Sequence, residues 1–94
     1  MRRKRSILGL AEDPRRNLLL FGTGGGKIGA LNLETGSERT LLEIPGEMAV
    51  DGMGLSANGT ALYTTLSPDT IGTLERRPPK PTQFLVWDYT QIAG

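Results

Sequence analysis

The chain has 94 residues, of which 37% are hydrophobic and 22% charged, and its formal net charge is +1. This length provides for one small domain, and the near balance of charge gives no overall attraction to nucleic acid or acidic membranes. The chain has no cysteine and no histidine, which excludes disulfides, thiolate sites, Ser-His-Asp triads and the usual zinc sites. Any catalysis would have to use carboxylates, Lys, Arg, Tyr or an oxygen-bound metal.

Residues 1–6 form a basic segment that we expect to be a disordered tail. The apolar stretch that follows, residues 7–11, is shorter than the roughly 7–15 residues of a secretory h-region. No stretch approaches the roughly 18 apolar residues that span a bilayer. The sequence therefore predicts no signal peptide and no membrane association, and it favours an intracellular location. Nucleic-acid binding through the basic side chains at 2–5 is the weakest interpretation that we carry.

Strand patterns dominate the rest of the chain. Apolar and β-branched runs bounded by Gly, Pro, Asn or Asp are typical of strands. Such runs occur at 17–21, 27–36, 38–44, 48–56, 60–66 and 82–92. No window longer than ten residues keeps a helical period free of Gly and Pro. Asn58 and Gly59 give the strongest hairpin signal. The sequence predicts an all-β fold of antiparallel strands.

Two parts of the chain resemble each other. The stretch "LGLAED" (8–13) is similar to "MGLSAN" (53–58) at an offset of 45. The stretch "IGALNL" (28–33) matches "FLVWDY" (84–89) at an offset of 56. Each similar stretch leads into or out of a strand-like run. We therefore expect the two halves of the chain to be structural repeats.

This similarity divides the chain after its tail into a first unit, 7–47, and a second unit, 48–94, with a proline-rich loop over 67–81. Each unit reads as strand, tight turn, strand, longer turn and strand, a β-meander. Units of roughly 40–50 residues with three or four strands are the signature of β-propeller blades. The sequence predicts about two such blades, with a small six- or seven-stranded β-barrel or sandwich as the alternative.

The second unit contains a motif that resembles known propeller families. The stretch "DGMGLSANGTALY" (51–63) resembles the blade motif of the gluconolactonase and strictosidine-synthase-like propellers and of the royal-jelly/yellow family. That motif runs roughly Asn/Asp-Gly-apolar-Ala-apolar-Ser-Pro-Asp-Gly-x-x-Leu-Tyr. The matching residues are Asp51, Gly52, Leu55, Ser56, Gly59, Leu62 and Tyr63. Because propellers usually need four to eight blades to close, the resemblance implies that a protein partner or further copies of the chain complete the ring.

Asp51 is the candidate metal ligand. In the gluconolactonase-like propellers the residue before the motif's glycine is an asparagine that binds the catalytic divalent metal, so the resemblance implies a Ca²⁺ ligand at Asp51. Leu66 stands where those families often have an aspartate. One carboxylate cannot make a metal site, and a turn or strand-end role is the competing interpretation. We expect no cofactor, and Ca²⁺ or another divalent metal only if the chain belongs to a hydrolase.

The glycine-rich stretch 21–36 poses a second question. Gly24, Gly26 and Gly29 satisfy the dinucleotide pattern G-x-G-x-x-G, but the sequence predicts a strand after Gly29 where that mechanism needs a helix. The spacing of a Walker A loop is not met either. We expect Gly24 and Gly26 to form the turn of a hairpin.

Trp87 and Asp88 resemble the Trp-Asp pair of repeat propellers, which implies packing between blades for Trp87 and a turn-capping role for Asp88. Two functions then remain. The first is a non-catalytic propeller fragment that serves as a protein interaction or assembly module. The second is part of a metal-dependent lactonase, with Asp51 as one ligand and the others on absent blades. The lack of His and Cys and of a complete ligand set favours the first.

Overall fold

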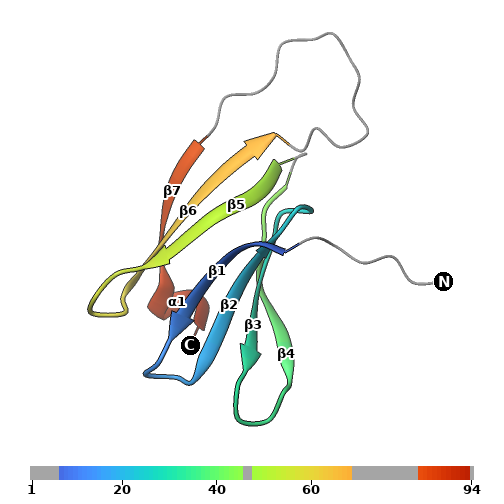
Figure 1. Cartoon of the computed structure of the whole chain (residues 1–94). Coiled ribbons are helices and arrows are strands. Elements are labelled where there is room, and N and C mark those ends of the chain that lie inside the picture. Colours follow the sequence, from blue (N-terminus) through green and yellow to red (C-terminus); the bar gives the residue numbers. More distant parts are fainter. Residues whose placement is uncertain (1–6, 46–47, 69–82, 94) are drawn as a thin grey trace, which may run out of the picture.

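The structure, a computed structural model, describes residues 7–45, 48–68 and 83–93. Two antiparallel sheets, each with its strands in chain order, make up this part of the chain (Figure 1). The first sheet contains β1 (Ile7–Asp13), β2 (Leu18–Thr23), β3 (Lys27–Asn32) and β4 (Glu38–Glu43). The second contains β5 (Met48–Leu55), β6 (Ala61–Pro68) and β7 (Gln83–Asp88), followed by the short helix α1 (Tyr89–Ala93). The predicted all-β class is confirmed.

Two boundaries differ from the sequence prediction. The last strand, expected over 82–92, ends at Asp88, and α1 begins at the next residue. The last hydrogen bond along β6 runs from the backbone N–H of Tyr89 to the carbonyl of Thr60 (2.9 Å), and the Tyr89 side chain is fully buried in the core where α1 begins. The loop expected over 67–81 begins later, because β6 continues through Pro68. The basic tail 1–6 and the loop residues 69–81 lie outside the described residues.

The hydrophobic core lies between the two sheets and is closed by α1. Its buried members come from β2, β3, β5, β6 and α1: Leu18, Leu20, Ile28, Ala30, Met48, Val50, Leu62, Leu66, Tyr89 and Ala93. The strands β1 and β5 run side by side in the same direction (Figure 1). A methyl group placed on Gly9 of β1 would lie 3.0 Å from Cγ of Met53 in β5, so the small residue allows this close approach.

The two sheets pair their strands in the same pattern. Neighbouring positions in the first sheet are Leu10, Phe21 and Gly29, and those in the second are Met53, Thr64 and Leu85. The shift is 43 residues for the first two strands, from 10 to 53 and from 21 to 64, and 56 for the third, from 29 to 85. Even the bulge recurs: the register shifts between Ile7 and Gly9 in β1, and between Val50 and Gly52 in β5.

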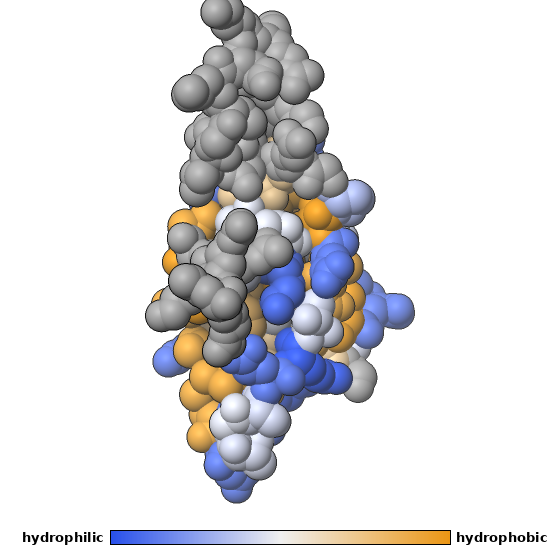
Figure 2. All heavy atoms as spheres, turned by 90° about the vertical axis from the view of Figure 1, so that its right-hand side faces the viewer, coloured by the Kyte–Doolittle hydropathy of each residue, from blue (hydrophilic) through white to orange (hydrophobic). Residues whose placement is uncertain are grey.

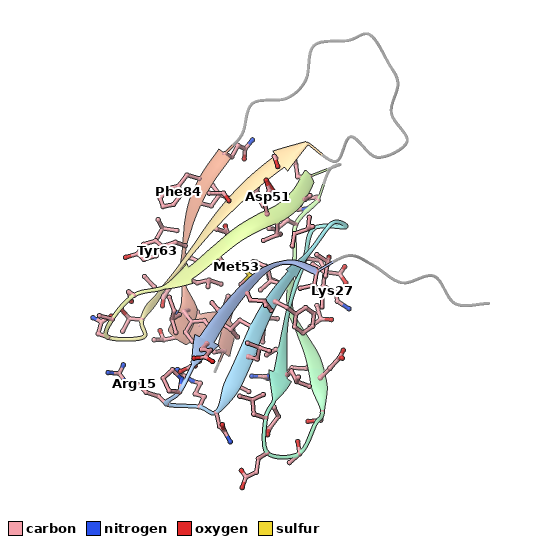
Figure 3. All side chains as sticks on the ribbon, viewed as in Figure 1. Arg15, Lys27, Asp51, Met53, Tyr63 and Phe84 are labelled. Atoms are coloured by element: carbon pink, nitrogen blue, oxygen red, sulfur yellow. The ribbon has the colours of Figure 1, made fainter. Side chains whose placement is uncertain are left out.

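The equivalent faces of the two sheets point the same way. The first sheet turns toward the second the face that carries Ala11, Leu20 and Ala30. The equivalent residues of the second sheet are Gly54, Tyr63 and Val86. Tyr63 lies on the face that points away from the first sheet (Figure 3). The sheets therefore stack front to back, which leaves one front face and one back face of the pair uncovered by the other sheet.

Candidate interaction surfaces

The uncovered front face belongs to the second sheet, and we call it the front surface. It is formed by Gly52, Gly54, Tyr63, Phe84 and Val86. The rings of Tyr63 and Phe84 stack with centroids 6.1 Å apart and an interplanar angle of 13°. Phe84 is 63% exposed and Val86 57% (Figure 3). An exposed cluster of aromatic and branched side chains on a regular sheet is typical of a surface that another polypeptide covers.

The uncovered back face belongs to the first sheet, and we call it the back surface. One edge strand of this sheet is β1, where Ile7 and Leu10 are each 57% exposed. Phe21 of β2 pairs with Leu10 of β1, and its ring covers Gly29 of β3. Figure 2 views the molecule from the right-hand side of Figure 1 and shows hydrophobic surface on both flanks of a hydrophilic region. Both outer faces thus expose apolar residues.

Equivalent positions in the two sheets differ sharply in burial. Leu20, Ile28 and Ala30 on the front of the first sheet are at most 1% exposed because they lie in the core that the second sheet and α1 complete. Their counterparts on the front surface, listed in the same order, are Tyr63, Phe84 and Val86. On the back, Val50 is fully buried, whereas its counterpart Ile7 is exposed. In the described part of the chain, a front face packs against a back face at one place, the contact between the two sheets.

The glycine-rich turn lies between β2 and β3 and contains Gly24 and Gly26. Its amides are already in use: the hydroxyl of Thr23 accepts hydrogen bonds from the N–H groups of Gly25 and Lys27, each at 3.2 Å. The carbonyl of Thr23 accepts the N–H of Gly26 (3.2 Å). A phosphate cradle needs such amides to point at the ligand. In this turn the amides donate to the hydroxyl and the carbonyl of Thr23 instead.

We expect the substitution Gly26→Ala to lower the free energy of unfolding by about 2 kcal/mol, since a left-handed backbone disfavours Ala and the site is crowded. Gly26 has φ = +83°, and a methyl group there would lie 2.8 Å from the carbonyl oxygen of Ile44. Gly36 has nearly the same φ, +81°, but open space around it. Chemical denaturation should therefore give a smaller loss, about 1 kcal/mol, for Gly36→Ala. Equal losses would show that crowding at Gly26 is unimportant.

Asp51 lies at the bulge of β5, with its side chain exposed at one end of the front face (Figure 3). Its carboxylate accepts a hydrogen bond from the hydroxyl of Ser67 in β6. Within the described ranges, no group of three or more acidic, histidine or cysteine residues is placed so that it could hold a metal ion. The structure thus gives Asp51 one polar neighbour across the strand pair, and no described carboxylates gather around it into a metal site.

The other residues singled out in the sequence lie at turns and at the end of β7. The side-chain oxygen of Asn58 accepts hydrogen bonds from the hydroxyls of Ser56 and Thr60, both at 2.8 Å. Gly59 takes φ = +77° in the same turn. Trp87 is half-buried against the core, and its indole N–H donates to the hydroxyl of Thr64 (2.9 Å). Asp88 precedes α1 and accepts the hydroxyl of Thr90 (2.7 Å).

A buried polar cluster that the sequence did not indicate joins the first sheet to α1. Asp13 lies at the end of β1 and is 1% exposed. It accepts a hydrogen bond from the hydroxyl of Tyr89 (2.6 Å) and forms an ion pair with Arg16 (3.1 Å). The guanidinium of Arg16 lies 5.1 Å from the centre of the Tyr89 ring. Arg39 of β4 donates to the carbonyl of Ala93 at the other end of α1 (2.7 Å). The short helix is therefore tied to the first sheet at both ends.

The cluster shifts two pKa values in opposite directions. Burial alone would raise the pKa of Asp13, but the hydrogen bonds from Tyr89 and Arg16 and the charge of Arg16 outweigh it, so that the pKa is lower than usual. Burial raises the pKa of Tyr89 well above its usual range, and its hydrogen bond to the Asp13 carboxylate acts in the same direction. At neutral pH the pair is an ionised carboxylate and a neutral phenol. This arrangement suits structural support better than proton transfer.

No protein-family model matches the chain, and a search of curated proteins found no similar sequence. Among the residues described, no helix is long and apolar enough to cross a membrane. The two uncovered sheet faces therefore remain the features of the molecule with the strongest functional implication.

Proposed function

We propose that the chain is a non-catalytic assembly module of the β-propeller type, which works by packing its front and back surfaces against other polypeptide. One observation carries this proposal. Leu20, Ile28 and Ala30 on the front of the first sheet are at most 1% exposed. The equivalent residues of the second sheet, Tyr63, Phe84 and Val86, are 37–63% exposed. The two sets of residues are apolar and occupy equivalent positions. Because the set in the first sheet is buried, we expect the set in the second sheet to be buried as well, against another polypeptide.

The equivalent strand pairing of the two sheets supports the same interpretation. Successive blades of a propeller are antiparallel meanders that stack in one direction around an axis. The shift of 43 residues in the first two strands, the matching bulges and the parallel course of β1 and β5 are what such stacking requires (Figure 1). A two-layer sandwich related by a twofold axis would instead bring equivalent faces together. Front-to-back packing leaves one front face and one back face on which further polypeptide can pack.

The competing function, a fragment of a metal-dependent lactonase, gives a contrasting prediction for calcium. We expect millimolar Ca²⁺ to leave the melting temperature unchanged and lactones to remain intact. A calcium site occupied at about 100 times its Kd would add about 2.7 kcal/mol of stability. In a domain of this size that is a rise of about 10–20 °C, which thermal denaturation detects easily.

The variant Asp51→Ala makes this test specific. If calcium stabilised the wild type and this substitution removed the effect, with Glu43→Ala as an exposed carboxylate control, Asp51 would be a metal ligand. Lactone hydrolysis that required calcium and Asp51 would then replace our proposal by the hydrolase function. Hydrolysis without either requirement would point to a contaminant rather than to this chain.

A further inference from the structure

We propose that the partner of each surface is a second copy of this chain, bound head to tail, with the back surface of one copy on the front surface of the next. This inference rests on the proposed function and names its partner. The contact would continue the one that already exists inside the chain between the two sheets. Such a heterologous arrangement closes into a ring when the rotation per copy allows it.

The internal contact shows what each surface needs. In the second sheet, Met53 projects backward from β5 over Gly9 of β1, where a methyl group on Gly9 would come within 3.0 Å of its Cγ. The counterpart of Met53 in the first sheet is Leu10, which projects from the back surface and is 57% exposed. Met53 therefore packs against the front of the first sheet, whereas Leu10 has no equivalent surface to pack against in the described part of the same copy.

The matching seat lies on the front surface. The counterpart of Gly9 is Gly52, and the counterpart of Ala11 is Gly54, so β5 presents two glycines where β1 presents a glycine and an alanine. A methyl group on Gly54 would meet one atom within 4 Å, Cδ2 of Tyr63 at 4.0 Å, among the atoms outside its own chain neighbours. A methyl group on Gly52 would lie 2.7 Å from the hydroxyl oxygen of Thr65, so Gly54 is the open position. Leu10 of the next copy would therefore pack over Gly54 rather than over Gly52, the counterpart of the glycine under Met53.

The second copy also matches the wider chemistry of both faces. The back surface exposes Ile7 and Leu10, whose counterparts Val50 and Met53 already pack against a front face in this protein. The front surface exposes Phe84 and Val86, whose counterparts Ile28 and Ala30 are already covered by a back face. One departure is that Thr65 replaces Gly22, so the sheets of successive copies would lie further apart at that point.

Two variants, each blocking one surface, test this arrangement. Leu10→Asp puts a charge on the back surface, and Gly54→Arg fills the seat on the front surface. Leu33→Asp is the control, since Leu33 is also exposed (52%) but lies in the turn beyond the end of β3 and is not among the residues that define either surface. Size-exclusion chromatography with light scattering, from micromolar to near-millimolar protein, would measure mass for each variant, for the wild type and for mixtures.

Head-to-tail packing makes a distinctive prediction for the mixture. The wild type and Leu33→Asp should form multimers of about two to four copies, enough for four to eight sheets. Leu10→Asp alone and Gly54→Arg alone should be folded monomers. Their equimolar mixture should give a one-to-one dimer, because each variant keeps the surface that the other needs. Circular dichroism establishes that the variants are folded.

Several results would overturn the proposal. A folded wild type that stays monomeric at every concentration would exclude the second copy as partner, while the calcium and lactone assays would judge the proposed function separately. Multimers that survive in one single-surface variant would show that like surfaces pair with like, and the head-to-tail geometry would be wrong. A mixture of folded variants that remains monomeric beside a multimeric wild type would contradict it as well.

Discussion

Replacing Asp13 by Asn should lower the free energy of unfolding by about 3 kcal/mol at neutral pH. The carboxylate is 1% exposed and accepts hydrogen bonds from both the Tyr89 hydroxyl and Arg16. The variant replaces this charged acceptor by a neutral amide oxygen, which weakens both hydrogen bonds and removes the ion pair with Arg16. In a domain of this size the loss corresponds to a fall in melting temperature of about 10–20 °C. Thermal and chemical denaturation of the wild type and the variant measure it directly.

The pH dependence identifies the cause of that loss. The pKa of Asp13 is lower in the folded chain than the usual value of an aspartate, so the unfolded state binds more protons in acid. The stability that Asp13 provides is therefore complete above the unfolded pKa and is lost as the pH falls through the folded pKa. We expect the difference between wild type and Asp13→Asn to shrink steadily below about pH 4.

Tyr89→Phe provides the matched control, since it removes the hydroxyl and leaves the carboxylate and Arg16 in place. It should destabilise less than Asp13→Asn, by about 1.5 kcal/mol. The double variant should lose less than the sum of the two single losses, because the residues share one hydrogen bond. Strict additivity, or a loss in Asp13→Asn that stays constant from pH 7 to pH 2, would show that the cluster does not act as a unit.

Local patterns were sufficient to predict six of the seven described strands, whereas β1 (Ile7–Asp13) was not among the runs assigned as strands. Runs such as 17–21 and 60–66 combine β-branched or apolar residues with turn residues at both ends, and each coincides with a strand, β2 or β6. The Gly-rich turn and the Asn58-Gly59 turn follow from the need for left-handed backbone conformations. These signals depend on neighbours in the sequence, which is why they could be read without a structure.

Long-range relations were harder to predict. The sequence alignment of 8–13 with 53–58 uses an offset of 45, whereas the ladders place β1 and β5 at 43. The two-residue difference leaves every side chain on the same face, because side chains alternate with a period of two. The helix α1 was missed because five residues carry no periodic signal, and its position depends on Tyr89 reaching the core.

The candidate surfaces could be anticipated only in part. A shortage of blades predicts that some sheet faces need partners, but it does not say which side chains stand on them. That assignment requires the register of each strand pair, which places Leu10 on the back surface and Gly54 on the front surface. The Asp13 cluster was invisible in the sequence, since Asp13 and Tyr89 are 76 residues apart.

The second large effect that we expect is for Gly22→Ala, which should destabilise the chain by about 3 kcal/mol. Gly22 lies in β2 where the two sheets approach closely, and a methyl group there would be 2.4 Å from Cγ1 of Val50 and 2.8 Å from its Cβ. Both atoms belong to a fully buried side chain in a strand, so relief requires the sheets to move apart. Overpacking of this kind costs about 1–3 kcal/mol in well-packed cores.

Trimming Val50 separates this steric effect from a loss of strand propensity. Val50→Ala alone should cost about 2 kcal/mol, from two buried carbon atoms and the space they leave. Combined with Gly22→Ala, it should cost less than the two single losses together, because the new methyl group occupies the vacated space. Gly24→Ala is the control, since its nearest neighbour, Cδ1 of Leu8, would be 3.9 Å away, and it should change stability by less than about 0.5 kcal/mol. Additive losses in the double variant would mean that the sheets are not held at this distance by Gly22. The same close approach, between a glycine of one sheet and a branched side chain of the next, is what fixes the front-to-back stacking on which both uncovered surfaces depend.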